Sequence, residues 1–134
     1  MAELIREAEN GGLSFGDYTL SEKTKVKDFS YDGALYYVKS YAVTTKLEKN
    51  GAFLYESEPG TKVEEFKADD LGVAFMVEGK DDAEITLGLE PETSYAVTVN
   101  GVDSGSMKTN LGGKLTLSVS TGSGEAVKVA VAKG

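Results

Sequence analysis

Residues 72–101 have the sequence GVAFMVEGKDDAEITLGLEPETSYAVTVNG, and this stretch decides the fold class. Apolar side chains alternate there with small or polar ones in three runs: Val73, Phe75, Val77; Ile85, Leu87, Leu89; and Tyr95, Val97, Val99. Successive side chains of a β-strand point to opposite faces, so each run places its apolar members on one face. Polar and glycine-containing stretches separate the runs and predict turns. We therefore expect three short strands, each with one buried face.

The same alternation continues toward the C-terminus in Leu115, Leu117, Val119 and in Val127, Val129, Val131. Toward the N-terminus the pattern is less regular, with candidate strands at residues 13–18, 25–29, 34–41, 43–48, 52–56 and 62–66. An apolar face opposite a polar one is typical of antiparallel sheets. The sequence therefore predicts a single all-β domain over residues 1–134, an antiparallel β-sandwich of about 10–12 short strands. Its first part, residues 1–70, is less regular than the hairpins of residues 71–134.

Two dipeptides predict tight hairpins, and one segment is a candidate helix. Asn-Gly favours the two-residue type I′ turn because both central residues need a positive φ, and we expect such hairpins at Asn50-Gly51 and Asn100-Gly101. Residues 2–9 place Leu4, Ile5 and Ala8 at helical spacing, so they are the one candidate for a helix, although one or two turns are marginal in water without packing.

The composition favours strands and excludes several classes of function. The chain has 13 Val, 11 Thr and 7 Tyr but only 2 Ile, and branched and aromatic side chains fit a pleated surface. Absence of Cys and His removes disulfides, zinc fingers, iron-sulfur clusters, thiol nucleophiles and histidine-based catalysis. The 22 acidic against 14 basic residues give a net charge of −8, which disfavours nucleic acid as a partner. We expect no cofactor.

The chain has neither a stretch apolar enough for a membrane helix nor a recognisable signal peptide. We therefore expect no membrane insertion and a cytoplasmic location, with the cell surface or an assembled particle as the alternatives.

Residues 89–99, LEPETSYAVTV, resemble the L-x-P-x-T-x-Y-x-V-x-V signature of fibronectin type III domains. The resemblance implies an Ig-like sandwich in which Leu89, Pro91 and Tyr95 are structural. In that family the tyrosine closes a corner between two strands by bonding a backbone group a few residues upstream. The tryptophan that such domains bury on an early strand is missing from this chain.

The whole chain is also similar to a group of short bacterial proteins, some of which are labelled endosialidase. That resemblance implies activity on sialic acid. Sialidases generally hold the sugar carboxylate with a cluster of arginines, whose planar fork lysine does not supply. Arg6 is the one arginine of this chain, so we expect no sialidase activity.

Two sets of acidic residues are candidates for chemistry. Glu56 and Glu58 share one strand face and could act as a carboxylate pair on a glycoside, but a solvated face is the favoured interpretation. Asp81, Asp82 and Glu84 offer oxygen ligands for calcium, but the D-x-[DN]-x-[DN]-G loop is absent, so an ordinary acidic turn is favoured.

Tyrosines gather in one segment, at Tyr31, Tyr36, Tyr37 and Tyr41. On a strand Tyr37 and Tyr41 would share a face and Tyr36 would take the other. Such rings can cap the edge of a core or bind a ligand, since one end of a tyrosine is apolar and the other polar.

The favoured function is a non-catalytic structural or protein-interaction module, because no set of residues converges on catalysis while many strands create edges that can pair. Self-association is one form of it, suggested by Leu4 and Ile5, for which the sequence shows no partner within the chain. The alternative is a carbohydrate-binding accessory module that uses the tyrosine segment or the acidic loops. A small glycoside-active enzyme run by Glu56 and Glu58 is a third hypothesis.

Overall fold

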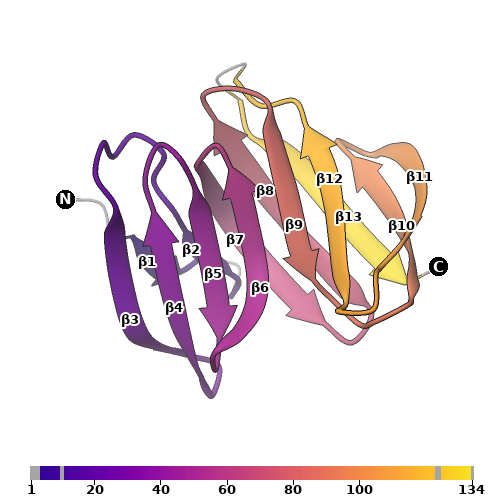
Figure 1. The fold of residues 1–134 in the computed structure, drawn as a ribbon, viewed down its shortest axis with the longest axis horizontal. Helices are drawn as coiled ribbons and strands as arrows, with labels where there is room; N and C mark the ends of the chain where they lie inside the picture. The colour runs from indigo at the N-terminus through magenta and orange to yellow at the C-terminus, as the bar shows by residue number, and fades with distance from the viewer. Residues whose placement is uncertain (1–3, 10, 123–124, 134) are drawn as a thin grey trace.

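The chain folds into two antiparallel β-sheets that pack face to face as a sandwich (Figure 1). The structure is a computed structural model that describes residues 4–9, 11–122 and 125–133. In these ranges it has thirteen strands and no helix. The strands are β1 (Ile5–Glu7), β2 (Leu13–Phe15), β3 (Thr24–Tyr31), β4 (Ala34–Ser40), β5 (Thr45–Lys49), β6 (Ala52–Glu58), β7 (Thr61–Asp69), β8 (Gly72–Gly79), β9 (Ala83–Gly88), β10 (Ser94–Val99), β11 (Val102–Lys108), β12 (Lys114–Val119) and β13 (Val127–Lys133).

The larger sheet has seven strands in the order β1-β2-β7-β8-β13-β10-β11, and the smaller has six in the order β12-β9-β6-β5-β4-β3. The predicted all-β sandwich is therefore confirmed. The described residues contain one strand more than the expected upper number. Two strands were not among the candidates: β1, which has only three residues, and β11, whose sequence VDSGSMK has no regular alternation and pairs with β10 through a register shift.

The core lies between the sheets and is built by the alternating residues that the sequence indicates. Of the five apolar runs in the second half of the chain, every member is buried except Leu89 and Val99, which are half-buried and pack against the core. Burying one face of each strand in this way is the main source of stability of a sandwich.

Both predicted Asn-Gly hairpins are present. Asn50 and Gly51 have φ values of 49° and 82°, and Asn100 and Gly101 have 53° and 79°, so both central residues are left-handed as a type I′ turn requires. A third turn of the same kind joins β3 to β4 at Asp32-Gly33, with φ values of 48° and 78°. The Asp-Gly signal for it was present in the sequence.

The candidate helix at residues 2–9 does not form over its described part. Ile5–Glu7 is strand β1, which pairs with β2 in a register that sets Ile5 opposite Phe15. Leu4 and Ile5 are buried in the core, so they have partners within the chain and give no reason for self-association. A helix of two turns is marginal in water. Here the segment is extended instead, and the extended form buries the side chains of Leu4 and Ile5. Residues 2 and 3 lie outside the described ranges.

A cluster of hydroxyl groups lies buried where β4, β5, β6 and β7 meet. Thr61 is its centre, because its Oγ1 lies 2.8 Å from the hydroxyl oxygens of both Tyr55 and Ser57. The Thr61 amide donates to Thr45 Oγ1 at 3.0 Å, and Thr45 Oγ1 is 2.7 Å from Ser40 Oγ. Burial raises the pKa of Tyr55, so its phenol stays protonated. Each of these buried polar groups has a partner, which is the condition for burying it without a large penalty.

We expect Ile5→Ala to lower the free energy of unfolding by about 2–5 kcal/mol, because a buried side chain is removed and a cavity is left. Ile5 is 3% exposed and packs in the core. Urea denaturation measures the effect. Leu35→Ala is the control, since Leu35 is 50% exposed and its loss is expected to change stability by less than about 0.5 kcal/mol. Equal effects of the two substitutions would contradict the burial of β1.

Candidate functional site

The four tyrosines singled out in the sequence do not form one surface. Tyr31 and Tyr36 lie on the inner side of the smaller sheet, with ring centroids 5.6 Å apart and the rings at 68°. Tyr37 is half-buried on the outer face, opposite Glu48 of β5. The expectation that Tyr37 and Tyr41 share a strand face is wrong, because β4 ends at Ser40 and Tyr41 lies in the following turn.

The acidic candidates lie on exposed surfaces. Asp81 and Asp82 are exposed in the turn between β8 and β9, and Glu84 is exposed on β9. Within the ranges that the structure describes, no group of three acidic residues is arranged to hold a metal ion. Glu56 and Glu58 point away from the core, because their neighbours Tyr55 and Ser57 are buried, and the register sets Glu58 opposite Glu84.

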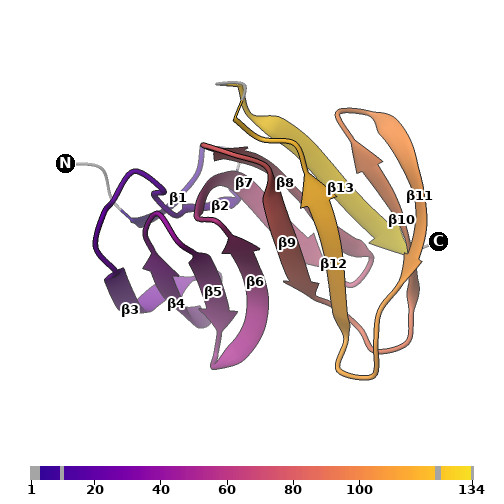
Figure 2. The ribbon, with the colours of Figure 1, turned by 45° about the horizontal axis from the view of Figure 1, so that its top comes forward.

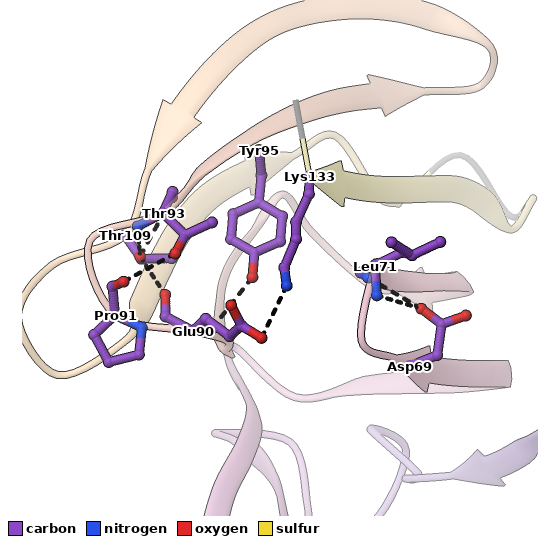
Figure 3. A network of polar contacts seen from close by, with 9 residues as sticks. Asp69, Leu71, Glu90, Pro91, Thr93, Tyr95, Thr109 and Lys133 are labelled. Atoms are coloured by element: carbon purple, nitrogen blue, oxygen red, sulfur yellow. Dashed lines mark hydrogen bonds and ion pairs between the residues drawn. The ribbon is translucent and has the colours of Figure 1, made fainter.

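Tyr95 holds the connection that carries the chain from β9 in the smaller sheet to β10 in the larger. Its ring is 2% exposed, and its hydroxyl accepts a hydrogen bond of 3.2 Å from the Glu90 amide (Figure 3). This contact is the one that defines a tyrosine corner. Lys133 at the end of β13 adds an ion pair of 2.8 Å to the Glu90 carboxylate, and that hydrogen bond raises the pKa of the Lys133 ammonium.

The corner also fixes the segment between β11 and β12. Buried Thr109 follows β11, and its hydroxyl donates to the Glu90 carbonyl. The Thr109 amide donates to the Thr93 carbonyl at 3.0 Å, and the Thr93 amide donates back to Thr109 Oγ1 at 2.9 Å (Figure 3). The start of β12 is thereby tied to the corner.

Each sheet of the described structure has two edge strands, and three of the four are protected against pairing with another chain. Strand β1 has three residues, β3 carries Lys25 and Lys27 and a bulge at Asp28, and β11 has an irregular register against β10 with a left-handed Gly105. Shortness, charge and bulges are the usual protections of sheet edges. Strand β12 has none of them along its length except Lys114 at its first residue, and it pairs with β9 over six consecutive residues without a bulge.

The register decides which backbone groups of β12 face outward. Just before the strand, the Leu89 amide donates to the Gly113 carbonyl at 2.7 Å, which makes this a hydrogen-bonded pair. Hydrogen-bonded and non-bonded pairs alternate along an antiparallel ladder. The pairs of Lys114, Thr116 and Ser118 are therefore non-bonded, and these three residues direct their amide and carbonyl groups away from β9.

Of these three residues, only Thr116 and Ser118 offer free backbone groups. Asn110 covers the first, because its side chain accepts from the Lys114 amide at 2.9 Å and its amide donates to the Lys114 carbonyl at 3.1 Å. No strand that the structure describes lies beyond β12, so Thr116 and Ser118 present two amides and two carbonyls at the edge. These are the groups that an added strand would bond.

Strand β11 of the larger sheet reaches beyond β12, so that the two sheets end in a step (Figures 1 and 2). Val102 and Met107 of β11 are on the inner side of the larger sheet, because they pair with Val99 and Tyr95, which belong to the core side of β10. Met107 is half-buried, but Val102 is 66% exposed, since no strand of the smaller sheet lies across from it. The step therefore combines free backbone groups on one wall with apolar side chains on the other.

The sequence contained only part of this site. The alternation of β12 and the apolar character of Val102 are visible in the chain, but nothing local shows that β12 ends a sheet or that β11 reaches past it. Val102 next to the Asn-Gly turn and Met107, in a strand otherwise made of small and charged residues, were the available signals.

Fold and site together define an all-β sandwich protein with an unprotected edge on its smaller sheet. Comparisons with models of protein families, with curated proteins and with solved structures gave no match. The described part of the chain also contains no helix long and apolar enough to cross a membrane.

We expect Tyr95→Phe to lower the free energy of unfolding by about 1–2 kcal/mol, because the hydrogen bond from the Glu90 amide is lost in a buried setting. Urea denaturation followed by far-ultraviolet circular dichroism measures it. Tyr37→Phe is the matched control, since that ring is on the outer face and its hydroxyl has no hydrogen-bond partner among the described residues. A Tyr95→Phe protein as stable as wild type would show that the corner contributes nothing.

Proposed function

We propose that the protein is a non-catalytic interaction module that binds an extended segment of a partner protein by adding it as a strand to β12. The observation that supports this most directly is the free edge at Thr116 and Ser118, in a strand without a bulge, next to an exposed Val102 on the opposing sheet. A strand added there would bond the free amides and carbonyls and cover the apolar side chains of β11.

The step favours one isolated strand over a second copy that pairs through its own β12. In each copy β12 already has the larger sheet packed beneath it, and β11 extends further still. Bringing two β12 strands side by side would require the two larger sheets to occupy the same space. A single extended segment has no second sheet and fits beside β12 without that clash.

The partner segment has a definable chemistry. Side chains that alternate along an added strand would point either toward Val102 and Met107 or toward solvent. The inner positions therefore require apolar residues. The outer positions lie beside Thr116 and Ser118, where small or polar residues fit.

The test is a selection of displayed seven-residue peptides against the intact protein, followed by affinity measurements on variants. Thr116→Pro removes an outward amide and places a ring at the edge, and proline is tolerated where the amide does not bond the neighbouring strand. We expect it to weaken the selected peptides by at least about tenfold, which corresponds to the loss of about one well-formed hydrogen bond.

Two controls separate the edge from other effects. Lys25→Pro makes the same change in β3 at the other edge of the smaller sheet, where the register also turns the amide outward, and it should leave binding unchanged. Thr116→Ala removes the 3.0 Å hydroxyl contact with Thr86 but keeps the amide, so binding should persist. Equal affinity for the Thr116→Pro protein would overturn the proposal.

Light scattering over a range of protein concentrations tests the association of two copies. We expect a monomer, because the step opposes pairing of two β12 strands. A dimer that Thr116→Pro abolishes would replace the peptide with a second copy as the occupant of the edge.

A further inference from the structure

A cleft with a volume of about 290 Å³ opens between the sheets at the end of the sandwich where β3 turns into β4, away from the β12 edge. Leu54 and Phe66 are among its apolar lining residues, and Tyr31 and Tyr36 line it from the smaller sheet. Its size is at the lower end of ligand sites, which suits a molecule of one ring.

Tyr36 supplies a polar group that the fold leaves unused. Its side chain is on the core side of β4, in line with buried Val38, and the residue is only 6% exposed. Its hydroxyl forms no hydrogen bond with a residue that the structure describes, whereas that of Tyr31 donates to the Gly11 carbonyl. Every fully enclosed polar side-chain atom among the described residues has a hydrogen-bond partner. Since the Tyr36 hydroxyl has none there, it is not fully enclosed but open to the space that its ring borders, the cleft.

The rest of the polar lining is balanced in charge. Asp32 and Asp69 contribute two carboxylates, and Lys49 and Lys67 contribute two ammonium groups. Asp32 and Lys49 form no ion pair with any described residue, so a donor and an acceptor are available near the Tyr36 hydroxyl. Burial raises the pKa of Tyr31 and Tyr36, with a further rise from the nearby Asp32 carboxylate, so both phenols remain donors at neutral pH.

We propose that this cleft binds one neutral, hydroxyl-rich ring of the size of a hexose. Apolar and aromatic walls can pack against the C–H faces of a sugar, while the Tyr36 hydroxyl, Asp32 and Lys49 can bond its hydroxyl groups. Opposite charges in equal number favour an uncharged ligand over an anion or a cation. A ligand with so few atoms is expected to bind in the millimolar range.

The test uses D-glucose, D-galactose and N-acetyl-D-glucosamine as probes, each titrated well above millimolar concentration into the ¹⁵N-labelled protein. We expect at least one of them to shift the amide signals of residues 31–36 and 49 while leaving those of β12 in place. Tyr36→Phe should weaken that sugar about fivefold, the effect of losing one hydrogen bond. The fold should persist in this variant, because the removed hydroxyl has no partner in the described chain.

Tyr37→Phe is the matched control, because it removes the hydroxyl of the adjacent tyrosine on the outer face of the same strand, and it should leave sugar binding unchanged. Absence of shifts at residues 31–36 with all three sugars would overturn the inference. So would equal binding to the Tyr36→Phe protein, or stronger shifts of the same amides by acetate or glycine than by any sugar. Thr116→Pro should not affect these titrations, so the test of sugar binding in the cleft is independent of the test of strand addition at β12.

Discussion

The hydrogen bond between the Glu90 amide and the Tyr95 hydroxyl holds the point where the chain crosses from the smaller sheet to the larger. The connection that this bond closes fixes the position at which β10 starts. Buried Thr109 bonds the same connection, so it also fixes the end of β11 and the segment that leads to β12. A loose crossing would let β11 and β12 shift relative to each other. Because the crossing is fixed, the step between the two sheets has a defined shape, and a defined shape is what an incoming strand needs in order to bind without a large ordering cost.

The four sheet edges show how the same chain both avoids and permits pairing. Bulges, lysines and a three-residue length protect three of them. Strand β12 is regular because its inner residues, Leu115, Leu117 and Val119, are all buried, and a bulge would turn some of them out of the core. Packing therefore keeps this edge straight, and its outward backbone groups are left free as a consequence.

The hydroxyl cluster around Thr61 and the hydroxyl of Tyr36, which has no partner among the described residues, show two different uses of polar groups near a core. Each hydroxyl of the cluster is paired, so it joins β4, β5, β6 and β7 without an unsatisfied group. Tyr36 is almost as buried, but its hydroxyl has no described partner and borders a cleft. In a stable core such a group is normally paired, and an unpaired one at a cleft is accordingly the place to look for a ligand.

The sequence by itself determined the all-β class, the strands of the second half except β11, and the two Asn-Gly turns, because alternation and turn chemistry are local properties. The resemblance to a known signature predicts a structural role for Tyr95, and the burial of Tyr95 and its bond from the Glu90 amide are consistent with that role. The local pattern failed at residues 4–9, where three-residue pairing with β2 overrides a weak helical spacing, and at Tyr41, where the strand ends one residue earlier than its apolar pattern suggests. Only the tertiary structure decided which strand ends a sheet, that β11 reaches past β12, and that Tyr31 and Tyr36 meet in a cleft while Tyr37 does not. These properties depend on the order of strands in the sheets, which joins residues far apart in the chain and leaves no trace in any local pattern.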